Sequence, residues 1–268
     1  MNIGRHYRGG AVGLSTAALY PHTATEDGLR VAAEAGFGVA EVFLQTIGEY
    51  HPRFLAELQA RAADHGVRVH AIHVHSRHFG FWAPYRRQRD EAVALFAEVV
   101  HMAASLGAVC IDWHGVSAQE AETVSIAEFF EVAGAMGERA ADSGVVLSIE
   151  NVSRCWMRGP AEIARVAQAR LPVGFTFDPF QAGEAGVDPL AVVAAMGDGL
   201  TNVHVNDYAL GHRHLPVGEG TLDWPALLAA IDATRYAGPL FLEAPQTDPA
   251  SFVRQRDFLM RSLTLPGW

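Results

Sequence analysis

Along this sequence, a helical stretch repeatedly ends at a glycine and is followed at once by a β-branched, apolar strand, a pattern that few folds can accommodate. Gly36, Gly66, Gly107 and Gly144 each stand at such a join of helix and strand, in the segments AEAGFGVAEVFL, AADHGVRVHAI, AASLGAVCIDW and AADSGVVLSIE. Glycine is the residue that most readily takes the left-handed conformation that ends a helix. Helix starts are also recognisable, as a capping box at Ser125 and Glu128 and as Asp-Pro pairs at 188–189 and 248–249.

Strand and helix therefore alternate along the whole chain. Candidate strands lie near residues 11–15, 39–44, 67–75, 108–114, 145–150, 173–178, 201–206 and 239–243. About eight βα units of roughly 30 residues in a chain of this length favour a closed barrel over an open, doubly wound sheet. No linker or shift in composition divides the chain, so we predict an α/β fold with one (β/α)8 TIM barrel domain over residues 1–268.

The composition excludes several kinds of chemistry and of partner. All 20 basic residues are arginine, so a lysine Schiff base and a lysine-containing phosphate loop are both excluded. The net charge of −10 argues against a nucleic-acid or anionic membrane surface. Two cysteines and an N-terminal segment without an apolar core fit a reducing compartment, and no stretch is apolar enough to span a membrane. We therefore expect a cytoplasmic protein whose electrophile is arginine, histidine or a metal.

Ionisable residues end six consecutive predicted strands. They are His73 or His75, His114, Glu150, Asp178, His204 and Glu243. Each has an ordinary explanation when taken alone, such as a hydrogen-bonded core histidine or a helix-capping aspartate. Together they lie at the end of the barrel where active sites form, and crowded carboxylates there need a cation. Mixed carboxylate and imidazole ligands favour Mn, Zn, Fe or Co over Ca.

The motifs at these strand ends resemble those of the xylose isomerase-like barrels, which include sugar and sugar-phosphate isomerases and epimerases and endonuclease IV. The motifs are HAIH, IDWHG, SIEN, FTFDPFQAG and NVHVND followed by HLPVGEGTLDW, and the resemblance covers essentially the whole chain. In the ketose epimerases, the resemblance implies one divalent ion, Mn or alternatively Zn, Co, Fe or Mg, held by the residues that match Glu150, Asp178, His204 and Glu243. It also implies that Glu150 and Glu243 exchange protons with the substrate through an enediolate.

The endonuclease IV branch adds further positions that could hold a second metal or contact substrate. His73, His114 and His214 match its pattern, whereas Gln181 and His212 replace a histidine and an aspartate of that pattern. An amide is a weaker ligand for a transition metal than imidazole. A one-metal site, or a reduced two-metal site, is compatible with both replacements.

Four further residues are candidates for contacting a substrate: Trp113, Arg154, Trp156 and Arg213. Arginine suits a phosphate or a carboxylate because it binds such groups in a bidentate manner. Asp207, three residues after His204, is a candidate for orienting that imidazole.

The leading prediction is a metal-dependent isomerase or epimerase of a small sugar or polyol. The alternatives are an endonuclease IV-like phosphodiesterase, a dehydratase on the same barrel, and a metal- or sugar-binding protein without turnover. No nucleic-acid or membrane partner is expected, and a homo-oligomer is left open.

Overall fold

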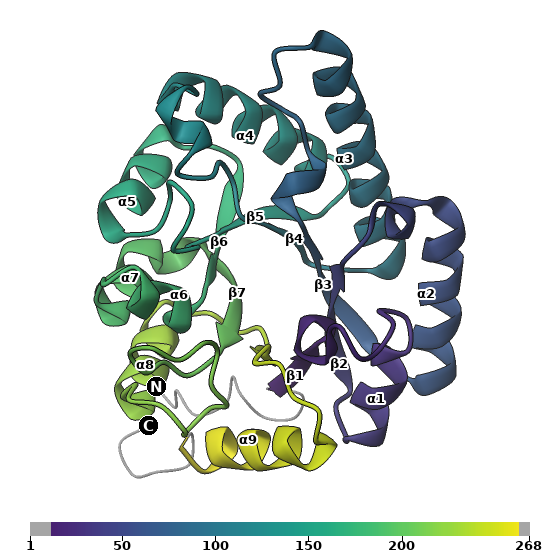
Figure 1. Ribbon diagram of the computed structural model, residues 1–268, viewed down its shortest axis with the longest axis vertical. Coiled ribbons are helices and arrows are strands. Elements are labelled where there is room, and N and C mark those ends of the chain that lie inside the picture. Colours follow the sequence, from purple (N-terminus) through teal and green to yellow (C-terminus); the bar gives the residue numbers. More distant parts are fainter. Residues whose placement is uncertain (1–11, 263–268) are drawn as a thin grey trace.

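The predicted strands close into one parallel barrel, in which each strand pairs with its neighbours in sequence and β1 pairs with β8 (Figure 1). The computed structural model describes residues 12–262, so residue 11 of the first predicted strand lies outside the described residues. The strands are β1 (Val12–Ser15), β2 (Val39–Leu44), β3 (Arg68–Val74), β4 (Cys110–Trp113), β5 (Val146–Glu150), β6 (Val173–Phe177), β7 (Leu200–Val205) and β8 (Leu240–Leu242). The predicted TIM barrel is thus confirmed.

A ring of helices surrounds the barrel. They are α1 (Gly28–Glu34), α2 (Pro52–His65), α3 (Arg86–Leu106), α4 (Ile126–Ala141), α5 (Pro160–Ala169), α6 (Pro179–Glu184), α7 (Pro189–Met196), α8 (Trp224–Ala233) and α9 (Pro249–Ser262). All four glycines expected at the joins have positive φ, from 64° to 81°. The capping box at Ser125 is also present, because its hydroxyl accepts from the Glu128 backbone N–H and Glu128 accepts from the Ser125 N–H.

The two faces of the strands have different partners. Side chains such as Val42, Ile111 and Leu147 point outward and join the apolar core between the strands and the helices. The alternating side chains fill the barrel, and at its lower end the ring of Phe241 occupies the space beside Gly13, where a Cβ would lie 2.5 Å from a ring carbon. Towards the carboxyl ends of the strands the interior becomes polar, which is unusual because barrel interiors are mostly filled by branched aliphatic residues.

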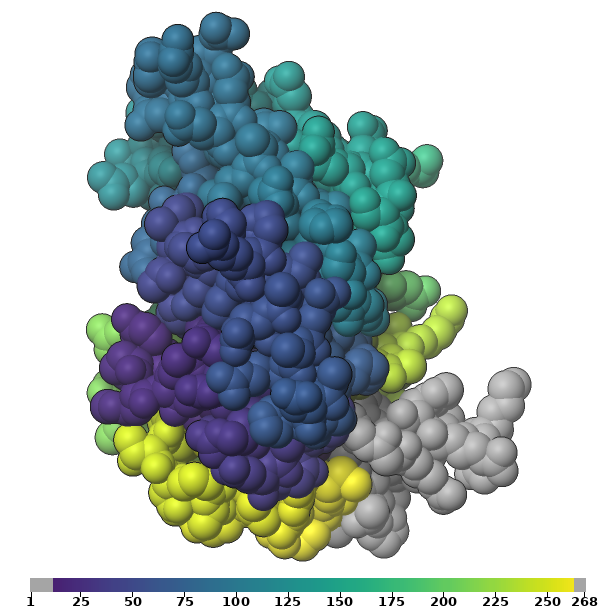
Figure 2. All heavy atoms as spheres, turned by 90° about the vertical axis from the view of Figure 1, so that its right-hand side faces the viewer, coloured from purple at the N-terminus to yellow at the C-terminus, as the bar shows by residue number. Residues whose placement is uncertain are grey.

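The last helix closes the ring on the side of α1. The guanidinium of Arg256 in α9 donates to the backbone oxygen of Ala35 at 3.1 Å and lies 5.6 Å from the centre of the Phe37 ring. In the space-filling view, the segments of α1, α2 and α3 and that of α9 form one continuous outer wall (Figure 2). Among the described residues, no helix has the length and apolar character needed to cross a membrane.

Candidate metal centre

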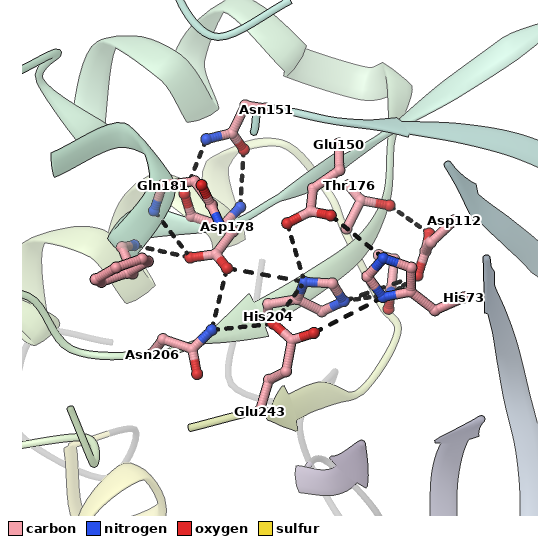
Figure 3. Close-up of polar contacts among 12 residues, drawn as sticks. His73, Asp112, Glu150, Asn151, Thr176, Asp178, Gln181, His204, Asn206 and Glu243 are labelled. Carbon is pink, nitrogen blue, oxygen red and sulfur yellow. Dashed lines mark hydrogen bonds and ion pairs between the residues drawn. The ribbon is translucent and has the colours of Figure 1, made fainter. Parts of the chain in front are cut away.

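Four side chains from four successive strands meet at the carboxyl end of the barrel. Nδ1 of His204 on β7 lies 3.5 Å from Glu150 Oε1 on β5, 3.9 Å from Asp178 Oδ2 after β6 and 3.3 Å from Glu243 Oε2 after β8 (Figure 3). All four side chains are buried. The structure therefore brings together the four residues that the family resemblance implied as ligands, with three carboxylates facing one imidazole nitrogen.

Asp178 has two roles, one for each oxygen. Its Oδ1 accepts from the backbone N–H groups of Phe180 and Gln181 and so caps α6, which begins with Pro179. Its Oδ2 faces the site. The capping role that sequence reasoning offered as an alternative is thus compatible with a role in the site.

Two asparagines that sequence reasoning missed fix the carboxylates in place. Asn151 donates to the backbone oxygen of Asp178 and accepts from its N–H, both at 2.8 Å. Asn206 donates to Asp178 Oδ2 at 3.0 Å and to Glu243 Oε2 at 3.1 Å. Asn151 directly follows the predicted strand 145–150, in SIEN, and Asn206 is the last residue of the predicted strand 201–206, in NVHVND. Those positions are the signal that could have identified them.

The orientation of the His204 ring is set by Glu41, a completely buried residue of β2. Oε2 of Glu41 lies 3.0 Å from Nε2 of His204. A carboxylate can only accept hydrogen bonds, so the proton of the ring sits on Nε2 and the lone pair of Nδ1 faces the other carboxylates once Nδ1 is deprotonated. Sequence reasoning missed Glu41, although a charged residue inside the apolar run VAEVFL was a visible signal.

Glu41 belongs to a hydrogen-bonded layer one pleat below the site. Asn202 of β7 donates to Glu41 at 2.7 Å and to Asp112 of β4 at 2.5 Å. Asp112 also accepts a short hydrogen bond from Thr176, whose hydroxyl contacts Ser148 at 2.6 Å. This layer is buried throughout and supports the site from below.

A second group of possible ligands shares Glu150 with the first. Nε2 of His114 lies 3.1 Å from Glu150 Oε2 and 2.8 Å from Nε2 of His73, which is itself 3.5 Å from the same carboxylate oxygen. The ring of His73 stacks on Phe43 with centroids 3.9 Å apart. Two imidazole nitrogens and one carboxylate oxygen thus point at one small region.

The electrostatics of the site show an excess of negative charge. Burial, together with Glu150 and Glu243, raises the pKa of Asp178 to about 8. Burial lowers the pKa of His204, but Glu243 and Glu41 outweigh it and raise that pKa well above its usual range. For Glu150, burial raises the pKa, yet His114 and His204 hold it well below the usual range. Without a cation, protons on Asp178 and His204 offset the crowded carboxylates.

The residues present fit a divalent cation. Glu150 Oε2 and His204 Nδ1 are buried and have no hydrogen-bond partner among the described residues. Groups of potential ligand atoms that lie within 4.8 Å of one another include Glu150, Asp178 and His204, and also Asp178, His214 and Glu243. Oxygen and imidazole nitrogen are the ligands preferred by Mn²⁺, Fe²⁺ and Zn²⁺.

A cavity of about 160 Å³ opens above these ligands. Its lining includes His73, His75, His114, Glu150, Arg154, Gln181, His214 and Glu243. His214 stacks on Phe180 with ring centroids 3.8 Å apart. The carbonyl oxygen of Gln181 accepts from the Ser153 backbone N–H at 3.0 Å and from its hydroxyl at 2.9 Å, so the atom that could bind a metal is already engaged.

Other residues predicted for the site lie elsewhere. Trp113 packs outside the barrel between Trp82 and Phe129, and Trp156 packs on Phe129. His212 and Arg213 are exposed in the β7–α8 loop and do not line the cavity.

Asp207 does not orient His204 as the sequence suggested. Its carboxylate accepts from the backbone N–H groups of Gly218 at 2.8 Å and Leu222 at 3.2 Å, and from the Trp224 indole at 2.8 Å. A Cβ on Gly220 would clash with the same carboxylate, so the GEGTLDW motif folds closely around Asp207. The motif holds the long β7–α8 loop in place.

Comparison with known proteins agrees with this architecture. The structure is similar to that of a D-tagatose 3-epimerase-like protein, with 19% identity, a TM-score of 0.79, and 94% of this chain and 97% of that chain covered. It is also similar to 3-keto-D-glucoside 4-epimerase from E. coli, with 19% identity, a TM-score of 0.75, and 94% of this chain and 99% of that chain covered. A third similar structure is that of a xylose isomerase-like TIM barrel protein from Mycobacterium smegmatis in complex with magnesium. It shows 14% identity and a TM-score of 0.73, with 95% of this chain and 96% of that chain covered.

No protein of curated function matches the chain by sequence. The profile of the xylose isomerase-like TIM barrel family matches residues 29–262. The chain therefore belongs to the xylose isomerase-like TIM barrel family.

Proposed function

We propose that this protein is a divalent-metal-dependent isomerase or epimerase of a small sugar, acting by proton transfer through an enediolate. The observation that carries the proposal is that Glu150 and Glu243 face the same His204 nitrogen from different walls, β5 and β8, with β6 and β7 between them (Figure 3). Two carboxylates on different sides of one substrate can remove a proton from one face and return one to the other. The similar epimerase structures support this reading at the level of the fold.

The residues of the chain divide the work between holding the ion and moving the proton. Glu150, Asp178, His204 and Glu243 would hold the ion, which supplies polarisation of the substrate carbonyl and stabilisation of the enediolate charge. Glu150 and Glu243 would each hold or release a proton at a carboxylate oxygen beside the substrate carbon. Asn206 donates to both Asp178 and Glu243 and so keeps their oxygens directed at the site.

The proposal is tested by deuterium exchange. Ketoses incubated in D₂O with the manganese-loaded protein should acquire deuterium at the carbon next to the carbonyl. Glu243→Gln should lower this exchange by roughly a hundredfold or more, since general acid–base groups contribute about 10²–10⁴-fold to a rate. Exchange at the wild-type rate in Glu243→Gln would remove that residue from the mechanism. Loss of water from the sugar, seen as an unsaturated product, would instead identify the dehydratase.

A second candidate is metal-dependent cleavage of a phosphoester, favoured by the group of His73, His114 and Glu150. His73, His114 and Glu150 would then hold a second ion, and two ions would supply stabilisation of the attacking and leaving oxygens of the phosphoester. The engaged carbonyl of Gln181 disfavours a third ion near Asp178. Elemental analysis of purified protein separates the candidates, because one manganese per chain supports isomerisation and two or three zinc ions support phosphoester cleavage.

A further inference from the structure

A second cavity adjoins the candidate metal centre and carries two arginines. Its volume is about 450 Å³, and His75, His114 and Arg154 line both this cavity and the one above the ligands. The two cavities therefore adjoin each other at these shared side chains. We call the second one the arginine cavity, after Arg154 and Arg77, which both line it.

Neither arginine of this cavity is paired with a carboxylate of the described residues. Among residues 12–262, no carboxylate oxygen lies within 4.0 Å of either guanidinium, whereas six other arginines form such pairs. Arg77 makes one long hydrogen bond, of 3.4 Å, to the backbone oxygen of Gln45, and Arg154 makes one of 3.4 Å to Nδ1 of His114. Since a guanidinium has five N–H donors, most donors of these two side chains have no protein partner within residues 12–262.

The backbone that carries Arg154 is fixed. The Arg154 carbonyl accepts from the Ala118 N–H at 2.9 Å, and the Trp156 N–H donates to the Val116 carbonyl at 2.9 Å. The loops after β4 and β5 are thus joined on both sides of Arg154. A charge presented from such a fixed segment loses less conformational freedom on binding a ligand than one on a free loop.

Two other side chains, Ser76 and Glu120, also bear on whether the arginine cavity can hold an anion. The hydroxyl oxygen of Ser76 is buried and has no hydrogen-bond partner among the described residues. Glu120 is the one acidic residue in the lining, and its Oε2 accepts from both the N–H and the hydroxyl of Ser117, at 3.0 and 2.7 Å. The two arginines therefore outnumber a single carboxylate that is already engaged.

We propose that the arginine cavity binds an anionic group of the substrate, a phosphate ester or a carboxylate, while the carbonyl end of the same molecule lies at Glu150 and Glu243. The proposal rests on the proposed function for the second half of that statement. It predicts that the natural substrate is a charged sugar, such as a ketose phosphate or a keto sugar acid, in preference to a neutral ketose.

The anion site is tested first without metal. Titration of the metal-free protein with inorganic phosphate, followed by calorimetry or NMR, should show saturable binding. Arg154→Gln and Arg77→Gln should each weaken this binding by roughly tenfold, as expected for loss of hydrogen bonds to an ion. Arg158→Gln is the matched control, because Arg158 is exposed like Arg77 and Arg154 but lies four residues after Arg154 and does not line the cavity. Absence of saturable binding, or equal binding in all variants, would overturn the proposal.

The class of anion is tested on the manganese-loaded protein with D-ribulose 5-phosphate, D-fructuronate and neutral D-ribulose. Tighter binding of the phosphate ester or of the sugar acid, lost in Arg154→Gln and kept in Arg158→Gln, identifies the group that the cavity takes. Equal affinity for all three overturns the proposal. Deuterium exchange on the neutral ketose alone would leave the proposed function standing and refute the anion site, whereas arginine-dependent phosphate binding without any exchange would do the reverse.

Discussion

Replacing Glu41 should weaken metal binding, although Glu41 is not among the three carboxylates that face His204 Nδ1. Its Oε2 lies 3.0 Å from His204 Nε2 and keeps the ring proton on that nitrogen, which leaves Nδ1 for the ion. In Glu41→Gln, the amide oxygen can still accept from His204 and Asn202, while the amide NH₂ meets the hydroxyl of Ser15. The hydrogen bonds around His204 are kept, while the negative charge beside His204 and His73 is lost.

The expected magnitude follows from that difference. Substitution of a group that hydrogen-bonds a metal-ligating histidine costs about 10–100-fold in metal affinity. Glu41→Gln should lie near the tenfold end, about 1.4 kcal/mol, because the hydrogen bond survives. Glu41→Leu removes the acceptor, so the ring proton can move to Nδ1, and the loss should approach a hundredfold, about 2.8 kcal/mol.

Isothermal titration of the metal-free variants with Mn²⁺ measures this loss directly, and melting temperatures show whether each variant folds. Asp207→Asn is the matched control: it lies on the same side of the barrel, three residues from His204, but binds the β7–α8 loop. It should lower the stability of the protein and leave manganese affinity within about twofold, well inside the tenfold change expected for Glu41. The reasoning is refuted if Glu41→Gln binds manganese as tightly as the wild type, or if Asp207→Asn loses affinity to the same extent.

Three further outcomes are expected. The pKa of Asp178 is raised to about 8 and that of His204 well above its usual range, so both side chains hold protons at neutral pH that an ion must displace. Manganese affinity should therefore rise with pH through this range, with about two protons released on binding. Calorimetry in buffers of different ionisation enthalpy measures the number of protons released. A flat pH profile would contradict this. Chelation should lower the melting temperature of the metal-loaded protein, because an ion at a hundred times its Kd adds about 2.7 kcal/mol to the free energy of unfolding. An unchanged melting temperature would argue against a bound ion. In α4, Gly137→Ala should destabilise the protein, because its Cβ would lie 2.5 Å from the Pro172 carbonyl oxygen. Gly134→Ala, whose Cβ would lie 3.6 Å from Leu171, should instead raise the free energy of unfolding by about 0.5–1 kcal/mol. Chemical denaturation measures both, and a change of the same sign in the two variants would refute the clash.

The fold and the residues at the strand ends of the site could be predicted from sequence, because both depend on the order of residues within each short segment of the chain. A glycine after each helix and an apolar run after each glycine place a strand, and the last inward residue of each strand then lies at one end of the barrel. His204 and Glu243 could be grouped in this way without knowledge of any contact. The charge of Glu41 inside the apolar run VAEVFL was visible in the sequence, but its pairing with the other His204 nitrogen was not, because the two residues are 163 positions apart and meet across the barrel.

The layer of side chains beneath the site, by contrast, could be predicted from the alternation of side chains along a strand, because the residue two positions before an inward-facing residue also faces inward. Counting back two residues from His114, Glu150, Asp178 and His204 gives Asp112, Ser148, Thr176 and Asn202, and all four are buried and hydrogen-bonded inside the barrel. The same parity puts Trp113, between Asp112 and His114, on the outer face, where it packs against aromatic rings rather than substrate. Asp207 is different, since its partners come from a loop that returns from residues 218–224. Parity can therefore separate inward from outward residues within a strand, but past the end of a strand only the folded loop decides what a carboxylate contacts.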